Sequence, residues 1–137
     1  MNQQFLHSTQ PIHFLALMEL YEHNYILVRR LFGDLKRLKT GDECPWHADV
    51  IARVRSAERH TLEIHFTDHR QLDAKQRPIR LKIRICHDAR TAELISKARR
   101  NQCLESKITL CIKKQFEQNQ LLKIWLTDQL DRLRLQN

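Results

Sequence analysis

The stretch IRLKIRICHDARTAELI, residues 79–95, decides how this chain is expected to fold. Its first half alternates aliphatic with polar residues, and a period of two is typical of a strand that buries one face. A second, less regular alternation follows, and His87 and Asp88 stand between the two runs. Two alternating runs joined by a short polar break predict a β-hairpin, and with it an antiparallel sheet.

Other parts of the chain repeat this pattern. Residues 46–56 and 60–67 each place apolar side chains on one side and polar or charged side chains on the other. Residues 104–112 alternate again and are expected to form a fifth strand or an extended segment. We interpret residues 40–45 as a loop that precedes the first strand. Together the alternating runs predict a meander of four to five strands over about residues 46–112.

Both ends of the chain have the spacing of amphipathic helices, over about residues 11–32 and 114–135. Pro11 suits the first turn of the first helix, and Gly33 can end it. The apolar stripes consist of Phe14, Leu17, Met18, Tyr21, Tyr25, Val28 and Phe32 in the first helix and of Leu122, Trp125, Leu126, Leu130 and Leu133 in the last. Because the sheet offers one apolar face, we expect an α+β fold with both helices packed on that face.

The overall composition is that of a basic globular protein. The chain has 137 residues, which suits a single domain, 1–137, with one core. It has no apolar run long enough to cross a bilayer and no signal-peptide pattern, so we expect a cytoplasmic protein without membrane contact. The four cysteines form no C-x-x-C pair and are expected to remain reduced thiols. The formal net charge is +8, and residues 70–114 contain thirteen Lys or Arg residues against four Asp or Glu residues.

The positive charge is expected to gather on one face of the sheet. Arg80, Lys82 and Arg84 fall on the polar side of their strand, and Arg53 and Arg55 take the polar side of an earlier one. Three interpretations remain open: a solvated surface, a surface for an acidic protein partner, or a site for RNA or a nucleotide. Because the basic strand lacks aromatic residues that stack on bases, the sequence favours a protein partner over nucleic acid.

His87 and Asp88 are interpreted first as a turn, since Asp accepts hydrogen bonds from backbone N–H groups at turns. A polar contact with a partner and a metal or catalytic role are the alternatives. The other candidate metal ligands are His47, His60, His65 and Cys86. Zinc needs three or four ligands, and none of these residues has a diagnostic spacing, so we expect no metal ion and no cofactor.

Two carboxylates also fall on the polar side of the strands. Glu63 and Glu93 can serve as acid and base, or they can neutralise Arg84 or Lys82 as cross-strand pairs. We favour ion pairs, because the chain has no G-x-S-x-G motif, P-loop or glycine-rich phosphate loop. The sequence therefore leans against an enzyme.

Four segments, MELYEHNYILVRRLF, RHTLEIHF, LKIRICHDARTAEL and NQLLKIWL, occur in an order that resembles the YqiB family of bacterial proteins, a domain of unknown function. The matching residues are Glu22, Asn24, Tyr25, His87, Asp88, Ala89, Arg90, Ala92, Glu93, Asn119, Leu121, Leu122, Trp125 and Leu126. Cys86 replaces an aromatic residue of the family pattern, and Lys113 and Lys114 replace acidic ones. The resemblance implies a small cytoplasmic protein with no established activity, cofactor or catalytic residue.

We therefore expect a non-catalytic interaction or regulatory protein, either a monomer or a homodimer. The residues expected to bind an acidic protein partner are Arg53, Arg55, Arg80, Lys82 and Arg84. The hairpin residues His87, Asp88, Arg90 and Glu93 are a second candidate site. Binding of RNA or a nucleotide through the same basic face is the alternative, and a small hydrolase is the third hypothesis.

Overall fold

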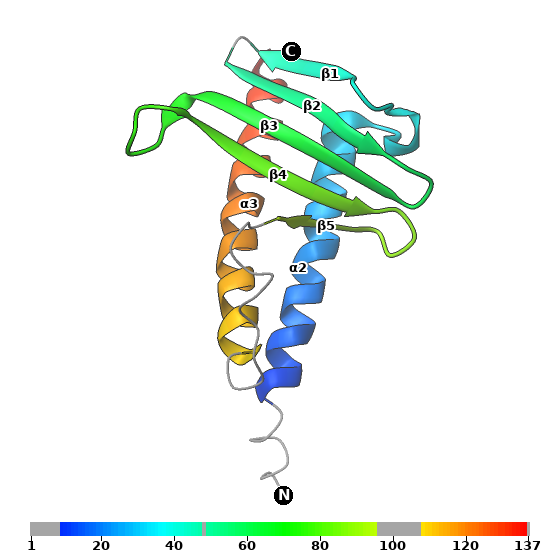
Figure 1. The fold of residues 1–137 in the computed structure, drawn as a ribbon, viewed down its shortest axis with the longest axis vertical. Helices are drawn as coiled ribbons and strands as arrows, with labels where there is room; N and C mark the ends of the chain where they lie inside the picture. The colour runs from blue at the N-terminus through cyan, green and yellow to red at the C-terminus, as the bar shows by residue number, and fades with distance from the viewer. Residues whose placement is uncertain (1–8, 48, 96–107, 137) are drawn as a thin grey trace, which may run out of the picture.

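The fold is a five-stranded antiparallel sheet with two long helices (Figure 1). The computed structural model describes residues 9–47, 49–95 and 108–136. The elements are α2 (Thr9–Phe32), the 3-10 turn η1 (Leu35–Arg37), β1 (Glu43–His47), β2 (Val50–Ala57), β3 (Thr61–Leu72), β4 (Pro78–Cys86), β5 (Thr91–Leu94) and α3 (Ile108–Gln136). The strands pair in sequence order, β1-β2-β3-β4-β5, so the predicted meander and the α+β class are confirmed.

The predicted boundaries were wrong at both ends of the sheet. The run 46–56 is divided between β1 and β2, and part of the predicted loop 40–45 belongs to β1. The apolar alternation passes across the turn between these strands, which hid the reversal of the chain.

Residues 108–112, expected to be extended, lie in the first turns of α3, whereas residues 104–107 lie outside the described part. Ile108 and Ile112 share the even phase but are also four residues apart, so this run fits a helix as well as a strand. The fifth strand of the sheet is therefore β1, and no strand follows β5 in the described residues.

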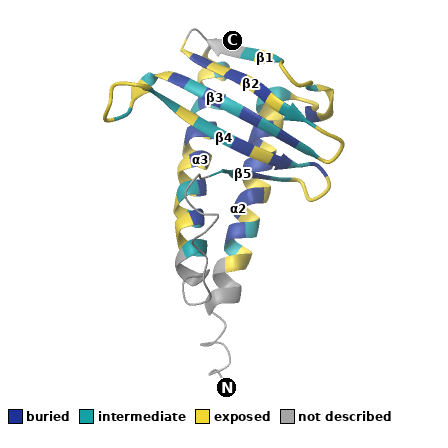
Figure 2. Ribbon diagram, viewed as in Figure 1, coloured by how far each residue is buried: buried dark blue, intermediate teal, exposed yellow. Residues whose placement is uncertain are grey.

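One face of the sheet forms the core. Figure 2 shows buried residues alternating with less buried ones along the central strands. The inward side chains of these strands, each at most 2% exposed, are Val50, Ala52, Val54, Leu62, Ile64, Phe66, Ile83, Ile85 and Ala92. Both helices lie on this face, behind the sheet in the view of Figure 1, and extend beyond β5. Val28 of α2 and Leu126 of α3 are completely buried. Each large side chain buried in this way stabilises the fold by about 1.5–3 kcal/mol.

Two buried asparagines join the helices to each other and to the sheet. The Nδ2 group of Asn24 in α2 donates to the backbone oxygen of Asn119 in α3 over 3.2 Å. The Oδ1 atom of Asn119 accepts the backbone N–H of Leu94 in β5 over 2.8 Å, and its Nδ2 group donates to the backbone oxygen of Gln115. Asn24 and Asn119 are fully buried, so these residues have a structural role.

Helix α2 ends where the sequence predicted. Gly33 has a φ of +79°, in the left-handed region that glycine adopts without a Cβ penalty. Its N–H donates to the backbone oxygen of Arg29 over 2.8 Å, which satisfies a carbonyl of the last turn. In the described residues no helix is both long and apolar enough to span a membrane.

Replacing Asn119 with alanine should lower the free energy of unfolding by about 2 kcal/mol, because the buried N–H of Leu94 would lose its acceptor. Urea unfolding monitored by circular dichroism measures the change. Gln120→Ala is the matched control, since Gln120 is the next residue of the same helix and is exposed. An equal effect of the two substitutions would contradict the structural role of Asn119.

Candidate functional site

The face of the sheet turned away from the helices, called the outer face below, carries the five predicted cations. Neither helix lies on this face in the described structure (Figure 1). The side chains of Arg53, Arg55, Arg80 and Arg84 are exposed, and that of Lys82 is half-buried. The phase predicted for strand β4 is therefore correct.

Ion pairs on the outer face neutralise part of this charge. Arg53 on β2 pairs with Glu43 directly opposite on β1. Arg84 on β4 lies 4.0 Å from the carboxylate of Glu93, its partner on β5. Exposed pairs of this kind contribute at most about 1 kcal/mol each, and they reduce the local charge available to a partner.

The five cations do not form one continuous row. Strand β3 lies between β2 and β4, so Arg53 and Lys82 are separated by His65 in the cross-strand register. Arg55 sits at an irregularity of the pairing between Val54 and Ser56. The row of Arg80, Lys82 and Arg84 would continue through Arg53 and Arg55 only if β2 were a neighbour of β4, and the sheet order rules that out.

The carboxylates predicted to form ion pairs have partners on this same face. Glu93 approaches Arg84, as expected, whereas Glu63 lies 2.6 Å from the Nε2 atom of His65. Glu63 and Glu93 occupy the positions on either side of Arg84 in the register. In the part of the chain that the structure describes, no three His, Cys, Asp or Glu residues gather as a metal site.

The residues His87–Arg90 form the turn between β4 and β5, because Cys86 and Thr91 are the last paired residues. The turn interpretation of His87 and Asp88 is confirmed, but the Asp88 carboxylate pairs with the side chain of His60, at 2.9 Å. His60 lies in the turn between β2 and β3, and its backbone oxygen accepts the N–H of His87. These contacts join two neighbouring turns of the sheet.

The four hairpin residues point to different environments instead of forming one site. The His87 side chain is buried, and burial lowers the pKa of its imidazole, with a further lowering by Lys36. Asp88 and Arg90 are exposed, and Glu93 lies on the outer face. This separation gives no arrangement of a nucleophile with a base.

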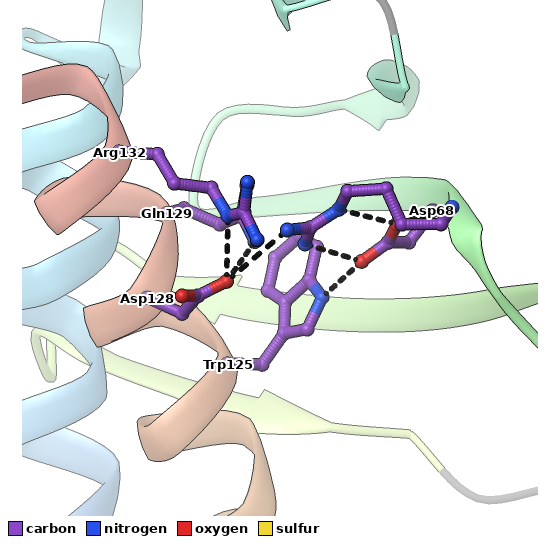
Figure 3. Close-up of polar contacts among 6 residues, drawn as sticks. Asp68, Trp125, Asp128, Gln129 and Arg132 are labelled. Atoms are coloured by element: carbon purple, nitrogen blue, oxygen red, sulfur yellow. Dashed lines mark hydrogen bonds and ion pairs between the residues drawn. The ribbon is translucent and has the colours of Figure 1, made fainter. Parts of the chain in front are cut away.

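A buried carboxylate on β3 was not foreseen from the sequence (Figure 3). Asp68 is 1% exposed. It accepts the indole Nε1–H of Trp125 over 2.9 Å and the Nε and terminal guanidinium N–H groups of Arg70 over 3.0 and 2.7 Å. Arg70 and Arg132 both donate to Asp128 of α3, over 3.4 and 3.0 Å. This Asp68 network therefore joins the far end of β3 to the last helix.

The protonation of Asp68 follows from these contacts. Burial alone would raise the pKa of this carboxyl group, but hydrogen bonds from the Arg70 side chain and the Trp125 indole outweigh burial. The backbone N–H of Arg70 adds a third hydrogen bond, and the pKa of Asp68 lies below its ordinary value. Asp68 is therefore ionised in the folded protein at neutral pH.

A groove of about 1050 Å³ lies beside this network, between strand β4 and helix α3. Strand β5 pairs with β4 only over Ile83–Cys86, so residues 78–81 of β4 have no second neighbouring strand in the described structure. The lining of this β4–α3 groove consists of Arg70, Gln71, Ile79, Arg80, Leu81, Lys82, Leu94, Ile95, Gln118, Leu121, Leu122, Ile124, Trp125, Asp128 and Arg132. Two of the predicted cations, Arg80 and Lys82, thus reach a groove that sequence reasoning missed.

The described lining of the groove is poor in groups that could take part in catalysis. Its described lining contains no His, Cys, Ser or Thr, and its one carboxylate, Asp128, already accepts hydrogen bonds from Arg70 and Arg132. Nucleophilic and acid–base catalysis need a reactive group within reach of a base or acid. The described residues of the groove offer no such pair.

The fold and these surfaces define a two-layer α+β protein with a basic outer face and an adjoining groove. The chain belongs to the family described as "Protein of unknown function (DUF1249)", whose sequence model matches residues 27–133. No curated protein and no solved structure matches it. The expectation of a domain of unknown function is confirmed at the level of this family.

Replacing Asp68 with asparagine should lower the free energy of unfolding at pH 7 by about 3 kcal/mol, because Arg70 loses its buried counter-ion. The contribution of Asp68 is present above its unfolded pKa of about 3.9 and is lost as the pH falls through the lower folded value. Urea unfolding at pH 7 and between about pH 4 and pH 2 should therefore give curves of the two proteins that converge in acid.

Asp131→Asn is the matched control for this prediction. Asp131 lies on the same helix as Asp128 and forms an exposed pair with Arg134, so its loss should cost less than about 0.5 kcal/mol. A difference between wild type and Asp68→Asn that stays constant down to pH 2 would contradict the proposed ionisation of Asp68.

Arg90→Gly should raise the free energy of unfolding by about 0.5–1 kcal/mol. Arg90 has a φ of +55°, a left-handed conformation that costs a residue with a Cβ atom energy and that glycine adopts readily. Thermal or urea unfolding measures the change. Ala89→Gly, at the preceding exposed position, should instead lower stability, and a destabilised Arg90→Gly would show that the Arg90 side chain stabilises the turn.

Proposed function

We propose that this protein is a non-catalytic interaction module that binds an acidic partner protein through its basic outer face. The observation that carries the proposal is the position of Arg55, Arg80 and Lys82 and their lack of a carboxylate partner within the described residues. These three cations lie on a face that neither helix covers, and no ion pair is found for them within the described residues.

The distribution of charge supports this proposal. The net charge of +8 attracts acidic proteins, and cations on an open face increase the rate of their association. Arg53 and Arg84, already paired with carboxylates, contribute less to the binding free energy than the three other cations. Ile51, 37% exposed on the outer face of β2, adds apolar surface next to Arg53.

Two further properties belong to the same proposal. The first is the relationship to the YqiB family, together with the bacterial origin and the cytoplasmic location that this resemblance implies. The protein would act as a monomer or a homodimer, and it would use no cofactor.

Binding of RNA or a nucleotide has weaker support. The outer-face positions of strands β2 to β5 carry no Phe, Tyr or Trp, while Phe66 on β3 is completely buried. Without aromatic side chains to stack on bases, only contacts with the phosphate backbone would remain. A small hydrolase has the least support, since the described lining of the β4–α3 groove lacks a nucleophile and a base.

The triple substitution Arg55→Glu, Arg80→Glu and Lys82→Glu should reduce the recovery of acidic partners at least about tenfold, because each reversal turns an attraction into a repulsion. The measurement is affinity capture from a bacterial lysate at low salt with quantitative mass spectrometry. Recovery by the wild-type protein should also fall as the salt concentration rises.

The matched control is Lys75→Glu, Lys113→Glu and Lys114→Glu, which changes the net charge equally at exposed positions away from the outer face. This control should keep its partners. Equal losses of partner recovery by both triple variants would show that recovery depends on net charge alone, which would contradict binding by the outer face. Unchanged recovery by the first triple would refute the proposal, and tighter retention of RNA than of any protein in a filter assay would favour the alternative.

A further inference from the structure

We propose that the β4–α3 groove holds a large apolar side chain of the same acidic partner, so that the partner is bound by charge on the outer face and by an apolar anchor in the groove. This inference rests on the proposed function and adds an apolar contact in the groove to the charge contacts on the outer face. The partner segment would be acidic and amphipathic.

The outer face and the groove meet at the edge of β4. Arg80 and Lys82 belong to the outer-face phase of the strand and also line the groove. Because β5 pairs only with Ile83–Cys86, the first half of β4 forms the border between the two surfaces. An acidic segment bound at Arg80 and Lys82 can therefore pass over this border without leaving the basic surface.

Two apolar side chains that line the groove are largely exposed to solvent. Leu121 and Ile124 lie three residues apart on α3, and they are 67% and 65% exposed although they line the groove. Leu122 and Trp125, on the same helix, form a buried base beneath them. Exposed apolar side chains gathered over a hollow and bordered by charge are typical of a protein-binding surface.

The charges around the groove select the kind of partner. Four cations line it, Arg70, Arg80, Lys82 and Arg132. Arg70 is paired with the buried Asp68 and Arg132 with Asp128, so Arg80 and Lys82 supply the positive charge that is not neutralised within the described residues. Asp128 is already bound to Arg70 and Arg132. A basic segment would be repelled, and a second copy of this chain, with its net charge of +8, would meet the same repulsion. An acidic segment with apolar side chains complements both the rim and the floor of the groove.

Contacts within the chain hold the floor of the groove in place. The indole N–H of Trp125 is held by Asp68, and its ring packs edge-on against Phe66 with ring centres 4.9 Å apart. A surface that is already ordered loses little conformational entropy on binding, which favours affinity. The Asp68 network thus prepares the groove in addition to stabilising the fold.

Two acetylated and amidated peptides of equal charge serve as probes, the amphipathic EELFDELLEE and the polar EESSDESSEE. The measurement is two-dimensional amide NMR of the full chain at low salt. We expect EELFDELLEE to shift the indole N–H of Trp125 and the amides of Leu121 and Ile124. We expect EESSDESSEE to bind at least about tenfold more weakly and to shift only residues of the outer face, such as Lys82.

The variant Leu121→Ser and Ile124→Ser should lower the affinity for EELFDELLEE about tenfold and leave that for EESSDESSEE unchanged. Both side chains are largely exposed, so the fold should be kept. Leu15→Ser and Leu135→Ser, 61% and 86% exposed and outside the groove, form the control and should change neither affinity.

Equal binding of the two peptides, or no effect of Leu121→Ser and Ile124→Ser, would overturn the anchor and leave the proposed function intact. No binding of either peptide would overturn the anchor and would remove the support for an acidic partner as well. A dimer in sedimentation equilibrium that the Leu121→Ser and Ile124→Ser variant abolishes would assign the groove to a second copy, which also overturns the inference.

Discussion

The central constraint of this structure is the inner face of strand β3. Leu62, Ile64 and Phe66 point into the core one after another, and each is at most 1% exposed. A strand that buries alternate residues leaves only one choice for the faces of its neighbours, because a slip by one residue would turn every side chain over. Strands β2 and β4 therefore follow the phase of β3, both helices gather on its apolar side, and the charged residues remain on the other.

The same strand also connects the core to the candidate site. The residue that follows Phe66 in the inward phase is Asp68, where an apolar residue would be expected. Its burial is tolerated because Arg70 and Trp125 satisfy the carboxylate, and Trp125 in turn forms the floor of the β4–α3 groove. A polar residue in an apolar position thus fixes the helix that shapes the groove, and stability and recognition depend on the same contacts.

Much of the fold could be predicted because period and phase are local properties of the sequence. Strand β4, the turn at His87 and the end of α2 at Gly33 were each recognised from adjacent residues. Strand β1 and the beginning of α3 were missed where one apolar pattern fits two structures. For the candidate site, exposure of the basic residues followed from phase, but their neighbours did not, because the order of strands is a property of the whole sheet. Asp68 continues the inward phase of Phe66, but the predicted run ended at residue 67, so its burial was not recognised.

The long separation between β3 and α3 has a consequence for how the protein is made. Asp68 and Trp125 are 57 residues apart, and α3 completes the cover over the sheet. During synthesis α2 and the strands leave the ribosome before α3, so the part of the apolar face that α3 covers stays open to water until this helix is made. The closing of the core is therefore a late and slow event, because it needs contacts between residues that are far apart in the sequence.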